Sequence, residues 1–464
     1  MAKETELKLR IALQHLAQFQ AHCDRIAQAE RTVTLNNTYF DDEKAELAKA
    51  KAALRIREKN GQFEQTFKCQ NASLGLQQSG EWNWPVPTAC LNTAVFEQED
   101  VAAHWPKTLN PSALQSVFCS EFTRQTWRYC HEQTEIEIAL DQGKISTTTA
   151  EQPLCEVELE LLTGEVAHLW QLAELLNQTT PLWLSDISKA ERGYALAKLQ
   201  RHGYECPSFS EQEDLSVVLP RWLAYHYQGL VRSLEFCLFD GRKKWAAQAL
   251  LHMEALHKLP QLSSKLYRRQ DSRILRENVL LWRTPLQELT ALCQLEEYLK
   301  DSAYSAESTA ISHLWQEQTQ KLLNEVQLAQ NLLAITQALL ALPQAQEANE
   351  SATHFLTHWL FAHKEVLAQI KTQRPQSAAQ WRHYKEPLLQ LWQAMDYQLG
   401  GRKTLKGLGE GRYQRTKDML TALNLLENPW PLVALTGTKS TALRAAEEYQ
   451  EWAQEHLVAL SADL

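Results

Sequence analysis

The chain has 464 residues, of which 44% are apolar and 22% are charged, and its formal net charge is −9. This composition excludes a single small module and a wholly disordered chain, and 56 acidic against 47 basic residues argue against a globally basic nucleic-acid binder. Nine cysteines without a CxxC pair fit neither a disulfide framework nor a zinc site. No apolar run approaches the roughly 18 residues that span a bilayer. We therefore expect a cytoplasmic protein with reduced thiols and with neither a membrane nor a nucleic-acid partner.

The spacing of apolar residues changes near residue 205. Residues 1–204 mix period-two segments with helical ones, whereas residues 217–464 carry leucine-rich stretches at helical spacing. A polar segment with Gly, Pro and Ser lies between them, at 201–214. We predict an α+β domain over 1–204 and an all-helical domain over 217–464, with helices at Leu219–Phe239, Lys243–Lys258, Ser272–Lys300, Ser308–Leu342, Ala352–Thr372, Gln380–Leu399, Tyr413–Leu426 and Ser440–Ala462.

Charged residues alternate with apolar ones in several segments of the first domain. In a strand, successive side chains point to opposite faces, so Glu4, Glu6, Lys8 and Arg10 share one face. The same alternation recurs in Leu54–Arg57, Glu64–Lys68, Phe122–Arg128, Glu135–Asp141 and Glu156–Leu161. A solvated face of an antiparallel sheet gives this pattern in any one segment. Here, however, acids and bases are sorted by segment, which favours an organised ionic surface.

Three carboxylates at positions 156, 158 and 160 would repel one another unless a cation lies among them, and a metal ion is the simplest candidate. If the strands close into a barrel, the ionic face points inward and helices must cover the apolar outer face. Helical periodicity predicts such helices at Leu13–Ala29, Glu43–Ala53 and Glu165–Asn177. The pattern indicates a site for a polyanion such as a phosphate chain, with Mg²⁺ on the surplus carboxylates.

The order of these motifs resembles the CYTH, or triphosphate tunnel metalloenzyme, superfamily. Glu4-Thr-Glu-Leu-Lys8 matches its ExExK signature, and the other motifs follow in the family's order: Asn37–Asp41, Leu54–Arg57, Lys68, Arg124, Ala139–Asp141, Cys155–Glu160 and Ser188–Tyr194. The position, length and helicity of the second half resemble a CHAD domain. The resemblance implies an eight-stranded antiparallel β tunnel with covering helices, followed by an all-α helical CHAD-like domain. It also implies hydrolysis of inorganic tripolyphosphate to phosphate and pyrophosphate with Mg²⁺, or alternatively Mn²⁺.

The resemblance also implies roles for individual residues. Metal ligands are expected at Glu4, Glu6, Asp141, Glu156 and Glu158, and phosphate contacts at Lys8, Arg55, Arg57, Lys68, Arg124 and Arg192. A water on an ion held by Glu156 and Glu158, or one polarised by Lys189, is the expected nucleophile, so these three residues are the predicted catalytic group. Lys189 is expected at the tunnel mouth. The chain departs from the family pattern in the segment 77–83. Family members often have a basic residue there, whereas the one charged residue of this chain in that segment is Glu81.

Two other functions remain open at this stage. The same tunnel could serve a nucleoside or thiamine triphosphatase or an adenylate cyclase, or the protein could be a scaffold that only binds polyphosphate. A CHAD-like domain implies long-chain polyphosphate as a partner. Its candidate basic segments are Arg242–Lys244, Arg268–Arg273 with Arg276, and Arg402–Lys417, although an ordinary solvated surface explains such runs equally well.

Overall fold

The chain consists of two compact units, residues 1–203 with 325–336 and residues 204–324 with 337–464. The structure, a computed structural model, describes residues 2–72, 76–199, 206–262, 266–300, 307–343, 348–373, 375, 377–401, 416, 418–420, 423, 451, 455 and 457–459. The predicted helices at Tyr413–Leu426 and Ser440–Ala462 and the basic segment Arg402–Lys417 lie mostly outside these residues.

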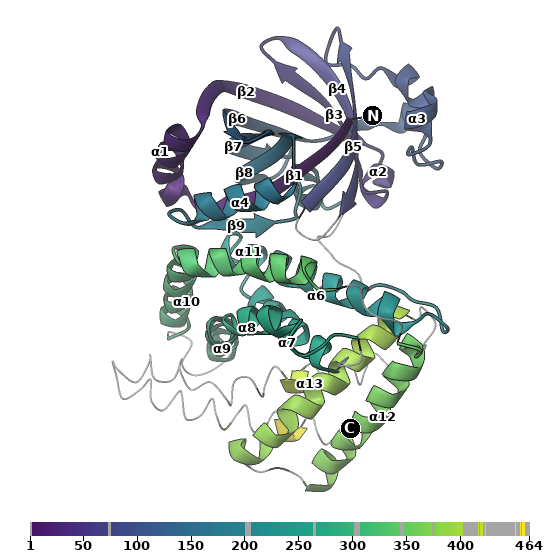
Figure 1. The fold of residues 1–464 in the computed structure, drawn as a ribbon, viewed down its shortest axis with the longest axis vertical. Helices are drawn as coiled ribbons and strands as arrows, with labels where there is room; N and C mark the ends of the chain where they lie inside the picture. Colours follow the sequence, from purple (N-terminus) through teal and green to yellow (C-terminus); the bar gives the residue numbers. More distant parts are fainter. Residues whose placement is uncertain are drawn as a thin grey trace. The chain divides into compact units, whose positions relative to one another are not determined.

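One antiparallel sheet dominates the first unit (Figure 1). Its strands are β1 Ala2–Ile11, β2 Gln28–Asp41, β3 Ala52–Lys59, β4 Gln62–Ala72, β5 Leu76–Val86, β6 Gln115–His131, β7 Thr134–Ser146, β8 Glu151–Thr163 and β9 Leu182–Ser185. The helices of this part are η1 Leu13–His15, α1 Leu16–Ile26, α2 Glu46–Lys49, η2 Thr93–Glu97, α3 Glu99–Ala102, η3 Pro111–Ala113, α4 Ala167–Asn177 and α5 Lys189–Leu196.

The sheet closes on itself at β1. The strand order is β5-β4-β3-β2-β6-β7-β8-β1, and β1 pairs with β5 as well as with β8, so eight strands form a ring. The ninth strand, β9, pairs with β1 over Lys8–Ile11, where β5 no longer reaches. The predicted antiparallel barrel is confirmed, but the sheet has nine strands where eight were expected. Strand β9 has only four residues, three apolar ones and Ser185, which are too few for a periodicity to reveal.

Strand register sets which side chains face the inside of the ring. Residues that stand opposite each other in neighbouring strands share a face, and the pairs run Lys8 with Glu158, Glu156 with Asp141, and Asp141 with Arg124. The same register continues through β2, β3, β4 and β5, and it places Arg55, Arg57, Lys68 and Glu81 on that face. The ionic face predicted from the alternation is therefore the inner face.

Aromatic side chains on the outer face pack against the covering segments. Trp127 of β6 meets Phe19 of α1 edge-on at 6.1 Å, and its indole Nε1 donates a 2.7 Å hydrogen bond to Asp24. Over β4, Phe67 packs against Trp105, which stacks on Phe96 at 4.0 Å. This burial of large apolar rings is the main stabilising contribution on the outside of the ring.

The helix α5 lies on the inner side of the ring. Its Tyr194 packs with Phe118, Phe122 and Leu154, which share the inner face with the ionic residues further along the strands. A Cβ atom at Gly193 would lie only 2.0 Å from Phe118 Cε2, so glycine permits this close approach. Ser188 caps the helix by accepting a hydrogen bond from the Glu191 amide. These contacts fix Lys189 and Arg192 relative to β7 and β8.

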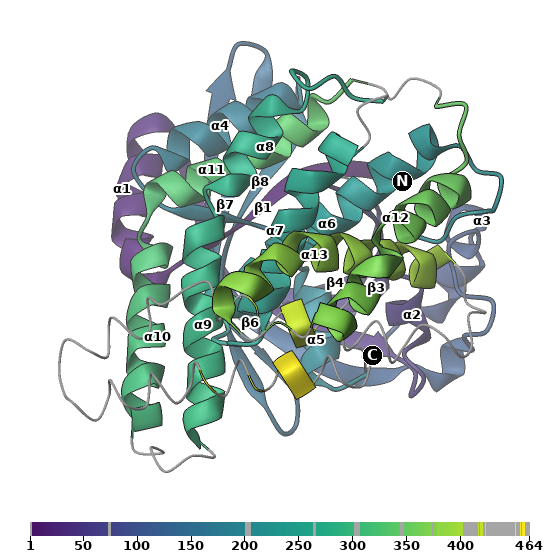
Figure 2. The same ribbon diagram turned by 90° about the horizontal axis from the view of Figure 1, so that it is seen from below.

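The second unit is helical. It contains α6 Leu215–Leu238, α7 Trp245–Leu262, α8 Arg273–Leu280, α9 Arg283–Lys300, α10 Glu307–Leu323, α12 Ala352–Gln373 and α13 Ala378–Gly401, whereas α11 Val326–Leu340 falls mostly in the first unit's residues. Figure 2 shows α9 and α10 side by side. The predicted helix Ser272–Lys300 is split, because Pro285 lacks an amide donor and its ring would clash with the carbonyl of Leu281.

Candidate active site

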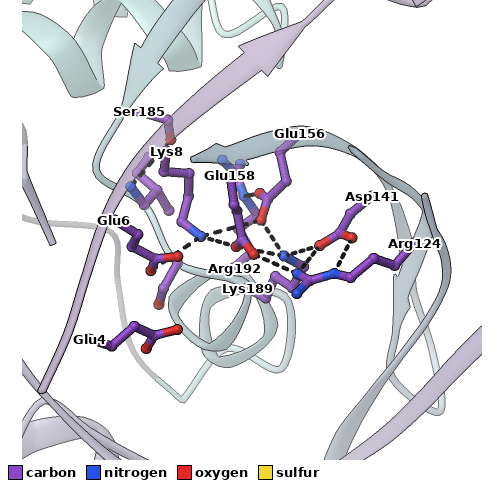
Figure 3. Close-up of polar contacts among 12 residues, drawn as sticks. Glu4, Glu6, Lys8, Arg124, Asp141, Glu156, Glu158, Ser185, Lys189 and Arg192 are labelled. Atoms are coloured by element: carbon purple, nitrogen blue, oxygen red, sulfur yellow. Dashed lines mark hydrogen bonds and ion pairs between the residues drawn. The ribbon is translucent and has the colours of Figure 1, made fainter. Parts of the chain in front are cut away.

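A network of buried charges occupies the inner face where β1, β7 and β8 meet (Figure 3). Strand β1 contributes Glu4, Glu6, Lys8 and Arg10, and the last three are buried. Register places Glu6, Lys8 and Arg10 opposite Glu160, Glu158 and Glu156 of β8. The ExExK signature and the acidic strand thus meet across one strand pair.

The centre of the network is the Lys189 ammonium among three carboxylates. Lys189 Nζ lies 2.6 Å from Asp141 Oδ2, 2.5 Å from Glu156 Oε1 and 2.9 Å from Glu158 Oε1. Lys8 adds a second ammonium, which lies 3.4 Å from Glu156 Oε1 and also donates to Glu158. The charge pattern predicted a cation among these acids, with a metal ion as the simplest candidate, and the Lys189 ammonium lies among them. Lys189 is buried, and its helix α5 packs on the inner face.

Mutual pairing keeps Glu158 and Lys189 charged despite their burial. Burial by itself would raise the pKa of Glu158, but Lys189, Lys8 and Arg124 together hold it well below its usual value. Burial likewise opposes the Lys189 cation, but Asp141, Glu156 and Glu158 outweigh it and raise the pKa of Lys189. Lys189 is therefore an ammonium at neutral pH, which means that it supplies positive charge and cannot accept a proton.

Arg124 of β6 forms hydrogen bonds with two of the three carboxylates, Asp141 and Glu158. Its Nε donates to Asp141 Oδ1 and its Nη2 to Asp141 Oδ2, both at 2.7 Å, and Nη2 also lies 2.5 Å from Glu158 Oε2. This fork geometry fixes both partners in orientation as well as in charge. Arg192 of α5, only 1% exposed, points its Nε toward Glu156 Oε2 at 4.0 Å.

A second acidic group lies around Lys68. The Lys68 ammonium contacts Glu4, lies 3.8 Å from Glu6 Oε1 and lies 3.6 Å from Glu81 Oε2. Glu81 is the acid found where a basic residue was expected, and here it is a partner of Lys68. Burial and the neighbouring carboxylates, Glu4 first among them, raise the pKa of Glu160 to about 7, so negative charge is in excess at this end of β8.

Positive charge is in excess on β3. Arg57 Nε donates a 2.9 Å hydrogen bond to Asn37 Oδ1, and the Tyr39 hydroxyl is a hydrogen-bond partner of Arg55. Within the described residues, neither guanidinium forms an ion pair with a carboxylate. Burial, with the nearby Arg55 and Arg124 cations, lowers the pKa of Arg57 to about 9. Both side chains are half-buried, and the Glu81 carboxylate helps to raise the pKa of Arg55 without forming an ion pair with it. Two such guanidinium groups form a site that favours an anion.

The carboxylates fit a hard divalent cation. One ligand oxygen each from Asp141, Glu156 and Glu158 can be chosen so that all lie within 4.8 Å of one another. In the described part of the chain, Glu156 Oε2 is buried and accepts no hydrogen bond. Carboxylate oxygens are the ligands that Mg²⁺ and Mn²⁺ prefer, and a buried carboxylate oxygen without a donor is favourable for an ion.

The structure brings most of the predicted residues together, in three neighbouring groups. Asp141, Glu156 and Glu158 gather with Lys8, Arg124, Lys189 and Arg192; Glu4 and Glu6 gather with Lys68; Arg55 and Arg57 lie together on β3. Sequence reasoning assigned no site role to Asn37, Tyr39 or Glu81, and it counted Glu160 among three acids around a cation without naming it as a ligand. Asn37 and Tyr39 lie two residues apart before Asp41 in the matched motif, a period-two signal that could have placed them on the inner face.

Comparison with known proteins assigns the first unit to a family. Residues 2–194 match the CYTH domain model, so this part of the chain is a CYTH domain. The curated inorganic triphosphatase of Haemophilus influenzae is 33% identical over 207 residues, which cover 43% of this chain and 56% of the relative. The chain thus spans about half the length of that curated relative.

Solved structures resemble each part of the chain. A putative adenylyl cyclase from Hippeastrum, described as having a dominant triphosphatase activity, is 20% identical and covers 43% of this chain and 100% of its own, with a TM-score of 0.33. The CHAD domain of the plant Ricinus communis is 15% identical and covers 57% of this chain and 98% of its own, with a TM-score of 0.42. The CYTH prediction is confirmed, and we keep the CHAD assignment as a proposal. No helix in the described residues is long and apolar enough to cross a membrane.

Proposed function

We propose that the CYTH domain hydrolyses inorganic tripolyphosphate to phosphate and pyrophosphate with a divalent cation, Mg²⁺ before Mn²⁺. The observation that carries the proposal is the pair of half-buried guanidinium groups of Arg55 and Arg57. Within the described residues they form no ion pair with a carboxylate, and they share the inner face with a cluster of carboxylates in which Glu156 Oε2 accepts no hydrogen bond. A phosphate chain supplies an anionic partner for the two arginines. A divalent cation supplies further positive charge to the carboxylate cluster.

Each group of side chains has a separate task in this mechanism. Arg55, Arg57 and Lys68 bind phosphate oxygens, and Arg124 joins the phosphate site to the carboxylates through its bonds to Asp141 and Glu158. Glu156 and Glu158 hold the cation, with Asp141 beside them and Glu4 and Glu6 as further ligands. When bound, the cation neutralises phosphate oxygens and lowers the pKa of a water molecule. Lys189, as an ammonium at neutral pH, stabilises the negative charge that develops during phosphoryl transfer.

The substrate assignment is tested by competition. Purified full-length protein with Mg²⁺ should release phosphate from tripolyphosphate faster than from ATP or thiamine triphosphate at equal concentration, measured as kcat/KM. The physical reason is that the inner face offers charges on β1 and β3–β8 for a phosphate chain, whereas an organic moiety needs an apolar or stacking surface beside it. Faster turnover of an organic triphosphate would assign a nucleoside or thiamine triphosphatase to this barrel. Formation of cyclic AMP would identify a cyclase, and absence of all turnover would leave a binding scaffold.

The helical unit supports a second proposal, that it is a CHAD-type domain that binds long-chain polyphosphate. A hollow of about 690 Å³ is lined by Arg268, Arg269, Arg273 and Arg276. In the described residues Arg268 and Arg269 form no ion pair, and burial together with the Arg283, Lys258 and Arg276 cations lowers the pKa of the adjoining His257 to about 4. Positive charge is therefore in excess there. By contrast, Lys243 and Lys244 of the first basic segment are paired with Glu296 and Glu297.

The double variant Arg268→Gln/Arg269→Gln should weaken long-chain polyphosphate binding about tenfold or more, because each charge-assisted contact is worth roughly 1.5 to 3 kcal/mol. Fluorescence anisotropy with labelled polyphosphate measures the change. Lys244→Gln, which removes one exposed charge that is already paired, is the matched control and should leave affinity unchanged. Equal losses in both variants would indicate a nonspecific effect of charge and contradict a site at the hollow.

A further inference from the structure

The cluster of Asp141, Glu156 and Glu158 already holds a cation that the chain itself provides. The Lys189 ammonium contacts an oxygen of each carboxylate, and these contacts converge on one nitrogen (Figure 3). A divalent ion bound to the same three carboxylates must lie about 2.0 to 2.6 Å from each ligand oxygen. One oxygen of each carboxylate can be chosen so that all three lie within 4.8 Å of one another, and Lys189 Nζ lies 2.5 to 2.9 Å from an oxygen of each, so an ion held by all three would lie close to the ammonium.

Two cations at this point would repel each other strongly. Lys189 is only 7% exposed and Glu156 is fully buried, so solvent screens little of the repulsion. Binding of the ion therefore requires the ammonium to move away from at least part of the carboxylate cluster.

The Lys189 ammonium can move within this network. Its ammonium lies at the end of a four-carbon stem with rotatable bonds, and its backbone is the first residue of α5. Arg124, the other cation on Asp141, is held by two parallel hydrogen bonds of 2.7 Å. Lysine can exchange one set of contacts for another, whereas the arginine fork orients its partners.

We propose that Lys189 is an exchangeable counter-ion of the three-carboxylate site, present there when no divalent ion is bound and displaced when one binds. The choice of a divalent ion rests on the proposed function, but the exchange itself requires no hydrolysis. Lys189 is then a determinant of metal affinity, because its ammonium competes with the divalent ion for the same carboxylates and thereby lowers the affinity for the ion.

Metal affinity of three variants tests the exchange. Isothermal titration of the full chain with Mg²⁺ or Mn²⁺ alone, in phosphate-free buffer, should show about tenfold tighter binding or more for Lys189→Met, because the competing charge is gone. Lys189→Arg should bind the ion more weakly than the wild type, since a guanidinium fork holds carboxylates more firmly. Lys144→Met removes an exposed lysine paired with Glu151 on the outer face and should not change affinity.

Thermal unfolding gives a second readout. Without divalent ions, Lys189→Met should melt below the wild type, because the three carboxylates lose one of their cationic partners, and added Mg²⁺ should restore its melting temperature more than it raises that of the wild type. A merely structural role for Lys189 would give a loss that Mg²⁺ does not repair. Unchanged or weaker ion binding by Lys189→Met, or tighter binding by Lys189→Arg, would overturn the proposal. If the ion exchanges with Lys189 but no triphosphate is hydrolysed, the proposed function fails and the exchange stands.

Discussion

Glu156→Gln should reduce kcat for tripolyphosphate by about 10² to 10³, the usual cost of removing one group that stabilises the transition state. Glu156 is fully buried, bonds to Lys189 and Lys8, and keeps an oxygen free of hydrogen bonds for an ion. Glutamine has the same shape but no charge, so it leaves the carboxylate cluster with one negative charge fewer. Phosphate release at saturating tripolyphosphate and Mg²⁺ measures the loss.

The same change should destabilise the fold, because Lys189 and Lys8 would share fewer carboxylates in a buried place, a type of loss that costs about 3 to 5 kcal/mol. Circular dichroism at the assay temperature must therefore show that the variant is folded before its turnover is interpreted. Glu151→Gln, an exposed acid on the outer face of the same strand, is the matched control and should keep wild-type turnover. Wild-type turnover by Glu156→Gln would refute the carboxylate cluster as the active site.

Arg57→Gln should weaken substrate binding while making the substrate-free protein more stable. Burial and the Arg55 and Arg124 cations lower the pKa of Arg57 to about 9, so its charge is unfavourable in the folded state below that pH. Stability should therefore rise on removal of the charge, on the order of 1 kcal/mol, and the gain should be largest at neutral pH and smaller as pH rises above 9. KM for tripolyphosphate should rise about 10- to 100-fold, because one charge-assisted hydrogen bond is lost.

Chemical denaturation in phosphate-free buffer and steady-state kinetics measure the two effects. Arg128→Gln is the control, because Arg128 is a half-exposed residue of β6 that already pairs with Glu30 and Glu135. It should change neither KM nor stability by much. An Arg57→Gln protein that is less stable and keeps its KM would show that Arg57 has a structural role and does not bind phosphate.

The inner face of the barrel was largely predictable from sequence, because side-chain direction in a strand alternates with period two. Alternation placed Glu4, Glu6 and Lys8 on one face, and the ordered motifs predicted a CYTH domain before any contact was known. Short or capped segments were less predictable. The helix expected at Glu43–Ala53 is only the four-residue α2, preceded by Ala45 in the left-handed region at φ 55°, because Asp41 accepts hydrogen bonds from the Leu47 and Ala48 amides and folds the segment into a tight turn.

What the sequence determined, then, was the sorting of charges by strand and the family of the first domain. What only the tertiary structure decided was which charges pair with which. Lys8 and Glu158 are 150 residues apart, and Lys189 and Glu156 are 33 apart. Their contacts exist because β1 closes the ring and because Gly193 lets α5 approach Phe118. Local periodicity depends on neighbouring residues alone, whereas the pairing of buried charges depends on ring closure. For this reason the sequence predicted a cation among the carboxylates but could not show that the Lys189 ammonium lies there.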